Sequence, residues 1–348
     1  MELLVAMDDF LIREQGLSLR ECFGAIDKGA AQLVLVVDHR DCLVGVLTDG
    51  DVRRALLSGA SLEASASPYI NRNPITLVSE SSLAAMRLCE QHEVNHVILG
   101  EIGASPKGVY RYQPRALKMP AAFILAGGKG IRLLPLTLEK PKPLIEVGGK
   151  PILHRVLESL SEMGVHKVYL SVNYMSEKIE ESISDGTRFG LSVEYVHEEE
   201  PMGTASPLAL LKNLNDIEEL LVMNADLLSN ADFRSLVAYH RGQGNHLTVG
   251  VREHLTTIPF GVVKVDNGVV SGIEEKPSYL DMVSAGIYCI SKPVFSLIPT
   301  SPSDMPDLIN AAVASGKNVG AFPIHQSWID VGSHGDLQRA QNMFKWPN

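Results

Sequence analysis

The stretch from Phe123 to Leu153 constrains the fold of this 348-residue chain more than any other. The apolar run at its start, residues 121–126, is typical of a strand buried on both faces of a parallel sheet. Three glycines follow at once, so the backbone can turn tightly and present its N–H groups to an anion. Arg132, Lys140 and Lys142 bring positive charge to the same loop. Backbone donors beside these cations suit a triphosphate.

The two best-known nucleotide-binding loops do not fit this stretch. A P-loop, GxxxxGK[ST], needs a serine or threonine after its lysine, and none follows Lys129. The dinucleotide fingerprint GxGxxG would start at Gly128 and need a glycine where Leu133 stands. The loop therefore belongs to another class of phosphate site.

The run AGGKGIRLLPLTLEKPKPLIEVGGKP resembles the signature of the sugar-1-phosphate nucleotidyltransferases, GGxGxRLxPLTxxxPKPLxxVxGKP. The resemblance extends from Ala121 to about Phe344. It implies a catalytic role for Arg132, which would neutralise charge on the α-phosphate and pyrophosphate, and for Lys142, which would hold the attacking phosphate. The nucleotide-binding residues that it implies in this loop are Leu125, Ala126, Gly127, Gly128 and Gly130.

Composition limits the partners of the chain. A content of 45% hydrophobic and 21% charged residues is that of a globular protein, and the length allows two domains. The net charge of −10 argues against nucleic acid or an anionic membrane as the main partner. Neither a signal-peptide pattern nor an apolar run of spanning length occurs. Four cysteines lack metal-ligand spacing, so we expect reduced core thiols in a cytoplasmic protein: Cys22, Cys42, Cys89 and Cys289.

Residues 1–117 are predicted to form one domain and residues 118–348 another, with the linker within residues 110–120. In the first domain a polar turn joins two strand patterns as a hairpin, and a helix pattern follows. A similar set of strand and helix patterns then recurs more weakly. The predicted strands and helices are 33–38, 42–48 and 49–57, then 74–78, 82–92 and 96–99. An internal repeat of about 60 residues indicates two similar modules packed together.

The first repeat contains GVLTDGD, which fits GxxTxxD and resembles the CBS modules. The resemblance implies an α+β CBS pair that binds an adenine nucleotide through Gly45, Thr48 and Asp51. The second repeat has no Thr-x-x-Asp after residues 97–99, so we expect at most one nucleotide site. A purely structural or dimerising domain is the alternative.

Strand and helix patterns alternate after Ala121. Strands are predicted at 167–172, 191–196 and 220–223, and helices begin at Pro151 as first helical residue and at Glu177 with Ser176 as N-cap. This order predicts an α/β fold, a Rossmann-like, mostly parallel sheet with helices on both faces. Ligands of such sheets lie beyond the carboxyl ends of the strands.

Further motifs of the family fall at such strand ends. PMGTA, residues 201–205, resembles the family's PLGTAG, which implies that Gly203 and Thr204 contact the nucleotide. Asn224-Ala225-Asp226 and Trp328-Ile329-Asp330 resemble the two elements that supply metal-binding carboxylates. We therefore expect Asp226 and Asp330 to hold Mg²⁺.

The sugar-pocket segments of the family have counterparts between these motifs. The resemblance implies that Gly261 and Glu275 face sugar hydroxyls and that Lys276 binds the sugar phosphate. Ser284 stands where the family usually has asparagine, so a sugar contact there would lack the amide. The expected partners are a nucleoside triphosphate and a sugar 1-phosphate, and we expect a homo-oligomer.

Glu198 is the candidate for base selection. Relatives that use thymidine or uridine triphosphates commonly have glutamine five residues before the glycine of the PMGTA-like turn, and this chain has Glu198. An ionised carboxylate only accepts hydrogen bonds, and guanine offers two adjacent donors, N1–H and the 2-amino group. The sequence therefore favours GTP, although a solvated acidic turn over residues 198–200 is the alternative.

The sequence is compatible with three classes of function. Fusion of CBS modules to this catalytic domain resembles the glucosamine-1-phosphate guanylyltransferases of legionaminic acid synthesis, which favours glucosamine 1-phosphate over mannose or glucose 1-phosphate. A catalytically silent nucleotide-binding regulator is a second class. A sugar-phosphate kinase or phosphatase is a third, but no P-loop or evident nucleophile motif supports it.

Overall fold

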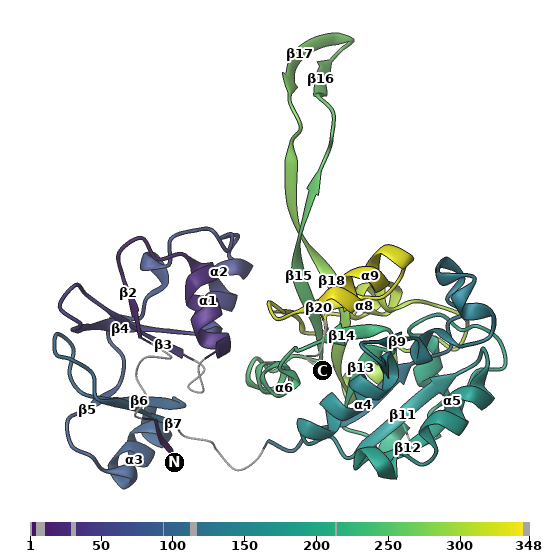
Figure 1. Cartoon of the computed structure of the whole chain (residues 1–348), viewed down its shortest axis with the longest axis horizontal. Helices are drawn as coiled ribbons and strands as arrows, with labels where there is room; N and C mark the ends of the chain where they lie inside the picture. Colours follow the sequence, from purple (N-terminus) through teal and green to yellow (C-terminus); the bar gives the residue numbers. More distant parts are fainter. Residues whose placement is uncertain are drawn as a thin grey trace. The chain divides into compact units, whose positions relative to one another are not determined.

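The computed structural model describes residues 2–4, 11–28, 33–92, 94–111, 117–212 and 214–343. The chain divides into two compact units, Met1–Leu117 and Lys118–Asn348 (Figure 1). Residues 112–116 of the predicted linker lie outside the described residues, and Tyr110 and Arg111 end a strand. None of the described helices has the length and apolar character needed to cross a membrane.

Unit 1 contains two small sheets with the orders β2-β3-β4 and β1-β7-β6-β5. In each sheet a helix connects two parallel strands, and the second of these strands forms an antiparallel hairpin with the strand after it. The repeated order agrees with the internal repeat in the sequence. The elements are β1 Glu2–Leu4, β2 Leu11–Arg13, α1 Leu19–Lys28, β3 Leu33–Val37, β4 Leu43–Thr48, α2 Asp49–Leu57, β5 Thr76–Leu77, α3 Ser82–His92, β6 His96–Leu99 and β7 Gly108–Arg111.

Unit 2 is built on a seven-stranded sheet with the order β12-β11-β8-β13-β18-β15-β19, in which only β18 runs opposite to the others. The mostly parallel sheet is confirmed. Its strands are β8 Ala121–Leu125, β11 Lys167–Val172, β12 Ser192–His197, β13 Glu219–Asn224, β15 Leu247–Thr257, β18 Ser278–Ser291 and β19 Val319–Pro323. Short strands complete the unit: β9 Glu146–Val147, β10 Lys150–Pro151, β14 Leu227–Ser229, β16 Val262–Asp266, β17 Val269–Glu274 and β20 Trp328–Asp330.

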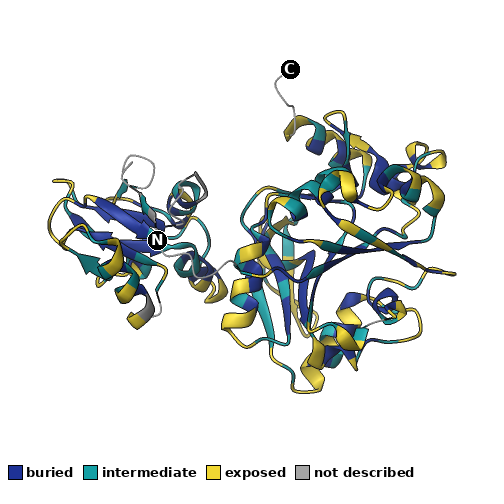
Figure 2. Ribbon diagram, turned by 90° about the horizontal axis from the view of Figure 1, so that it is seen from below, coloured by how far each residue is buried: buried dark blue, intermediate teal, exposed yellow. Residues whose placement is uncertain are grey.

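Helices cover both faces of this sheet. Phe123, Tyr169 and Val222 pack toward one face, in a buried cluster that also contains residues of the helices α7 and α8. On the other face, His240 of α6 contacts Thr248, and Tyr239 contacts Phe322. Figure 2 shows the buried strands between the exposed outer sides of the helices. The helices are α4 Ile152–Glu162, α5 Ser176–Ile183, α6 Phe233–Gly242, α7 Lys292–Phe295, α8 Met305–Ala314 and α9 His334–Met343.

Two predicted helix starts and one cysteine differ from expectation. Met175, at φ 53°, is the N-cap of α5 and Ser176 is already helical, so Ser176 makes no cap. Pro151 is the N-cap of α4, because it still pairs with Glu146 in β10. Cys42 is only half-buried beside the β3–β4 turn, whereas the other three cysteines are buried; all four are free thiols.

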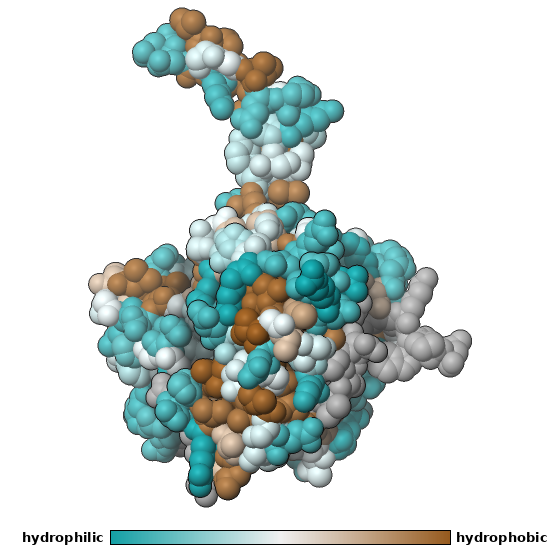
Figure 3. Space-filling view, turned by 90° about the vertical axis from the view of Figure 1, so that its left-hand side faces the viewer, coloured by the Kyte–Doolittle hydropathy of each residue, from teal (hydrophilic) through white to brown (hydrophobic). Residues whose placement is uncertain are grey.

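A long hairpin, which we call the arm (residues 251–284), leaves the body of unit 2. β15 and β18 stay paired from Val251 and Ser284 out to Thr257 and Ser278, and β16 and β17 form its tip. Figure 1 shows the arm standing away from the sheet, and Figure 3 shows apolar residues gathered near its end. The sequence did not predict this projection.

Candidate active site

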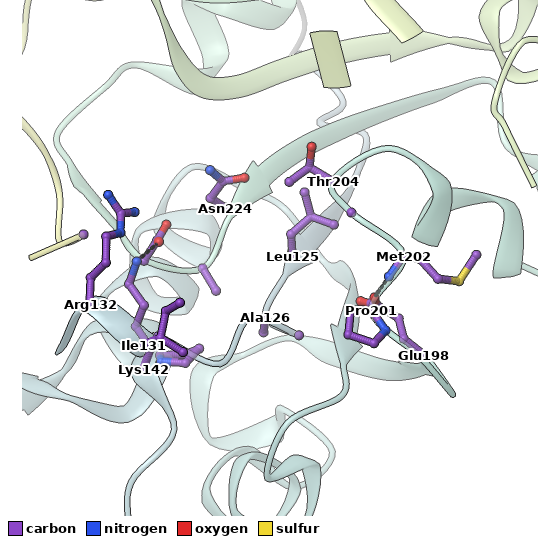
Figure 4. A pocket seen from close by; sticks show the side chains of 18 residues that line it. Leu125, Ala126, Ile131, Arg132, Lys142, Glu198, Pro201, Met202, Thr204 and Asn224 are labelled. Atoms are coloured by element: carbon purple, nitrogen blue, oxygen red, sulfur yellow. Dashed lines mark hydrogen bonds and ion pairs between the residues drawn. The ribbon is translucent and has the colours of Figure 1, made fainter. Parts of the chain in front are cut away.

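A pocket of about 380 Å³ opens at the carboxyl ends of β8, β12 and β13 (Figure 4). This edge of the sheet is where an α/β fold binds its ligands. The pocket collects eleven of the residues predicted from the sequence: Leu125, Ala126, Gly127, Gly128, Gly130, Arg132, Lys142, Glu198, Gly203, Thr204 and Asp226.

The glycines of the loop after β8 are needed for close packing. A Cβ atom on Gly127 would lie 2.7 Å from Glu198 Oε1, so a side chain would push into the carboxylate. Gly130 has a φ of +61°, and its Cβ would lie 2.9 Å from side-chain atoms of both Lys142 and Thr137. Thr137 also donates a hydrogen bond to the Gly130 carbonyl at 3.0 Å. The loop is therefore closely packed, and its glycine backbone has the freedom to turn its N–H groups toward an anion.

Two cations reach the pocket from the short 3₁₀ helices of this loop. Lys142 is buried and forms an ion pair with Asp226, and its Nζ lies 3.9 Å from Asp330 Oδ1. Arg132 lies against Gly332, where a Cβ atom would come within 3.2 Å of its Nη2. Gly332 also lines the pocket. Its lack of a side chain therefore leaves room for the guanidinium, a contact that the sequence did not predict.

Asp226 and Asp330 come together because β14 and β20 pair antiparallel directly after Asp226, with Leu227 opposite Asp330. The Val331 N–H donates to the Asp226 carbonyl at 3.1 Å and closes the pair. Burial, and next the Asp226 carboxylate, raise the pKa of Asp330, while Lys142 and Arg132 oppose that rise. The two carboxylates predicted as metal ligands thus lie side by side, although Asp330 is not among the lining residues of the pocket.

The carboxylate pair fits a divalent cation. In the described part of the chain, the buried Oδ1 atoms of Asp226 and Asp330 have no hydrogen-bond partner. Oxygen atoms of two carboxylates are the ligands that Mg²⁺ prefers. Lys142 compensates their charge in this structure.

Another group with metal-ligand chemistry lies in the core, where Glu219, His240 and Cys289 offer atoms within 4.8 Å of one another. Cys289 donates to Glu219 at 3.1 Å, and both ring nitrogens of His240 are hydrogen-bonded to hydroxyls at 2.8 Å. Burial and the Glu219 carboxylate raise the pKa of Cys289 well above its usual range. Because these groups already satisfy one another and the thiol stays protonated, we interpret them as a structural network.

Glu198 follows β12 and is buried at the wall of the pocket. Its Oε1 accepts a hydrogen bond from Ser171 Oγ at 2.6 Å, and its Oε2 accepts one from the Met202 N–H at 3.1 Å. The carboxylate therefore holds the turn at 201–204 in place. Each oxygen keeps one further lone pair for a ligand. The solvated acidic turn describes Glu199 and Glu200, which are exposed, but not Glu198.

Asp304 is a residue of this site that sequence reasoning missed. Its Oδ1 accepts hydrogen bonds from the Thr204 N–H at 2.9 Å and from the Thr204 hydroxyl at 3.0 Å. In return, the Thr204 hydroxyl accepts from the Met305 N–H at 2.8 Å. The capping box between Asp304 and Asp307 is a recognisable helix start, but nothing in the sequence ties it to a turn a hundred residues earlier.

The predicted sugar-binding residues are placed differently. Gly261, Glu275 and Lys276 lie on the arm, outside the lining of the pocket. Gly261 and Glu275 are neighbours, because a Cβ atom on Gly261 would lie 3.0 Å from Glu275 Oε2. Ser284, at the root of the arm, is 3.0 Å from the Tyr288 hydroxyl.

The predicted regulatory residues lie in unit 1 at the start of α2. Thr48 donates from its N–H and its hydroxyl to Asp51 Oδ2, at 2.8 and 2.6 Å, in a capping box. Asp51 also pairs with Arg54 at 2.5 Å. Gly45 packs against residue 71, whose carbonyl oxygen would lie 2.5 Å from a Cβ. Each of the three residues therefore has a structural role in this unit.

Comparison with known proteins places the chain in a family. The nucleotidyl transferase family matches residues 121–345, and the chain belongs to this family. The similar curated proteins include the mannose-1-phosphate guanylyltransferase catalytic subunit beta of Drosophila pseudoobscura pseudoobscura, 35% identical over 222 residues, and that of Dictyostelium discoideum, 33% identical over 229 residues. The matches cover 62% and 64% of this chain and 60% and 64% of those proteins, less than two thirds of their length.

Solved structures show the same fold. A protein from Bacillus anthracis assigned as a glucose-1-phosphate thymidylyltransferase, in complex with a sucrose, gives a TM-score of 0.53 at 26% identity over 66% of this chain and 96% of that one. HddC from Yersinia pseudotuberculosis, complexed with GMP-PN, gives 0.53 at 25% identity over 65% of this chain and 100% of that one.

Proposed function

We propose that the chain transfers a nucleotidyl group from a nucleoside triphosphate to a sugar 1-phosphate and releases pyrophosphate. The observation that carries the proposal is the convergence, at one edge of the sheet, of a glycine-rich turn, Arg132, Lys142 and the pair Asp226–Asp330. Such a set suits two phosphorylated substrates that must react despite their like charges.

The chemistry follows from the groups present. An oxygen of the sugar phosphate attacks the α-phosphorus, a new P–O bond forms, and the bond to the β-phosphate oxygen breaks as pyrophosphate takes the electron pair. The attacking phosphate is already ionised at pH 7, so positioning and charge stabilisation replace a general base. Arg132 stabilises charge on the α-phosphate and pyrophosphate. Lys142 exchanges its carboxylate partners for the sugar phosphate.

Asp226 and Asp330 would hold the Mg²⁺ that we propose as cofactor. When bound, such an ion offsets the negative charge of the triphosphate and of the developing leaving group. The aspartates' own part is to supply carboxylate oxygens, and the Oδ1 atom of each has no hydrogen-bond partner in the described structure. Lys142, tied to both, keeps these carboxylates compensated before the substrates enter.

We propose GTP as the triphosphate, because the buried Glu198 carboxylate retains acceptor capacity at the pocket wall. It can take both the N1–H and the 2-amino group of guanine, whereas thymine and uracil offer one donor between acceptors. The names of the relatives, guanylyltransferases and a GMP-PN complex, support this choice.

Glu198→Gln is expected to erode the preference for GTP over UTP and dTTP by roughly ten- to a hundredfold, because the amide presents a donor where guanine also has donors. The measurement is the ratio of kcat/KM values for GTP and dTTP. Glu199→Gln, in the exposed neighbour, is the matched control and should leave the ratio unchanged. Equal kcat/KM values for GTP and dTTP in the wild-type enzyme would falsify the assignment.

Glucosamine 1-phosphate is the proposed sugar, on the strength of the fusion with a CBS-like unit. Mannose 1-phosphate is the second candidate, because the catalytic unit matches proteins named mannose-1-phosphate guanylyltransferases. Rates of pyrophosphate release decide between them. They are measured for GTP, ATP, UTP and dTTP, each combined with glucosamine, mannose and glucose 1-phosphates. The pair with the highest kcat/KM identifies the substrates.

For unit 1 we propose a regulatory CBS pair that binds an adenine nucleotide at Gly45, Thr48 and Asp51. AMP is expected to bind the whole chain and to change the transfer rate by roughly five- to 150-fold, the usual range of allosteric coupling. Calorimetry with AMP, with GTP present to fill the catalytic pocket, tests binding, and rates with and without AMP test coupling. If AMP neither binds nor changes the transfer rate, unit 1 is a structural or dimerising element.

A further inference from the structure

The tip of the arm is an amphipathic ribbon with an uncovered apolar face. Val263 pairs with Ile273 and Val265 with Val270, so these four side chains share one face, and each is 48% to 68% exposed. The opposite face carries the ion pair between Lys264 and Glu274, at 3.3 Å. A two-stranded ribbon is at best marginally stable in water, so an exposed apolar face of this kind calls for a covering surface.

The body of unit 2 cannot easily cover this apolar face, because the arm holds the face away from it. Seven consecutive residue pairs, from Val251–Ser284 to Thr257–Ser278, connect the tip to the sheet. At about 3.3 Å per residue, this ladder holds the tip roughly 20 Å away from its root. With these pairs formed, residues of the tip are not among those that line the pocket of their own chain.

Among the described residues, the lining of the pocket offers one cation, Lys142, for the sugar phosphate. Its other cation of those described is Arg132, and in this structure Lys142 forms ion pairs with the two aspartates. Lys276, the residue predicted for the sugar phosphate, is at the base of the tip, with a φ of 47° that is uncommon for a side-chain-bearing residue. The pocket and its predicted sugar residues therefore lie on separated parts of one chain.

A second apolar surface lies beside the pocket. The loop that carries Arg132 exposes four large side chains by 45% to 70%, and they are Ile131, Leu134, Leu136 and Leu138. Ile131 itself lines the pocket. An apolar ribbon and an apolar loop on the same unit are complementary, and two copies related by a two-fold axis can satisfy both contacts at once.

We propose that two copies of the chain exchange arms, so that the apolar face of one arm covers the loop 131–138 of the other copy and its Lys276 and Glu275 complete the other copy's pocket. This inference rests on the proposed function, because it assigns the sugar-phosphate side of that site to residues of a second chain. Each active site is then shared between two copies, and an isolated copy binds the nucleotide but lacks the second cation, Lys276, for the acceptor.

Complementation between two defective chains tests the shared site. Lys276→Ala and Asp226→Asn are each expected to lower the transfer rate at least a hundredfold. Co-expressed with different tags and purified through both, they form a mixed dimer in which one pocket of two has an intact Asp226 and receives an intact Lys276. The expected rate is about half that of the wild type. A mixed dimer no faster than the single variants overturns the proposal.

Light scattering and sedimentation test the association without using activity. The wild type should be a dimer at micromolar concentration, and Val265→Asp with Ile273→Asp should give a folded monomer. Lys264→Gln, on the polar face of the same ribbon, is the matched control and should remain dimeric. A monomeric wild type, or a variant pair that stays dimeric, contradicts arm exchange. If the wild type dimerises through the arm but transfers no nucleotide, the proposed function fails instead.

Discussion

Replacement of Asp226 by asparagine is expected to lower kcat by about a thousandfold or more and to leave the fold intact. Asp226 follows β13 two residues after its end, its Oδ1 atom has no hydrogen-bond partner within the described structure, and its other oxygen pairs with Lys142. The substitution keeps the size of the side chain and removes the charge that acts mainly in the transition state. Steady-state rates at saturating substrates measure the effect, and circular dichroism checks the fold.

The matched control for this loss is Asp216→Asn, which removes the same charge from an exposed position. It should change kcat by less than about twofold, because Asp216 is exposed, lies outside the lining of the pocket and is screened by solvent. Binding of Mn²⁺, followed by its electron spin resonance signal, should weaken in Asp226→Asn and persist in the control. An Asp226→Asn enzyme within tenfold of the wild-type kcat in excess Mg²⁺ would refute the metal assignment.

Gly203→Ala is expected to reduce kcat/KM by about a hundredfold and to destabilise the chain by about 2–4 kcal/mol. Gly203 has a φ of +80°, and a Cβ there would lie 2.4 Å from the Ser303 carbonyl oxygen and 2.9 Å from Asp304 Oδ1. The turn and the start of α8 would have to separate. That movement breaks the contacts of Thr204 with Asp304 and opens the pocket wall.

Gly316→Ala separates the two causes of the expected loss of stability, which are the strain of a positive φ and the collision of the new Cβ with residues 303–304. Gly316 has a φ of +67° but nothing within 4 Å of its Cβ position, so it carries the backbone strain without the collision. Its expected cost is only about 1–2 kcal/mol, with normal kcat/KM. Chemical denaturation and initial rates on both variants give the comparison. Equal losses in the two variants would mean that the contact with residues 303–304 is unimportant.

The regular elements could be predicted because their patterns are local. The strand at residues 167–172 was expected with the bounds it has in β11, since it is apolar on both faces. The helix starts were less accurate, because propensity favours Ser176 as a cap while the turn before α5 places Met175 there. The arm was not predicted, since its strands do not alternate with helices and its exposed valines resemble core residues.

The residues of the site likewise divide into those that a local motif predicts and those that only the three-dimensional fold reveals. Motifs with their own turn or strand end, such as the glycine loop and the Asp226 and Asp330 segments, were predicted and do meet. The residues that hold these motifs in place were not predicted. Ser171 donates a hydrogen bond to Glu198, Asp304 accepts hydrogen bonds from Thr204, and Gly332 leaves room for Arg132. Each of these contacts joins residues far apart in the chain, and their residue types are too common to indicate a partner.

The central claim, transfer of a nucleotidyl group, is tested most directly by ³¹P nuclear magnetic resonance of the complete reaction. The wild-type chain with GTP, Mg²⁺ and glucosamine or mannose 1-phosphate should consume both substrates together. It should give free pyrophosphate and the two coupled signals of a diphosphate diester, and no reaction should occur without the sugar phosphate. Formation of GDP with a phosphorylated sugar, release of orthophosphate, or an unchanged spectrum would contradict the claim, because these are the results of a kinase, a phosphatase and a catalytically silent regulator.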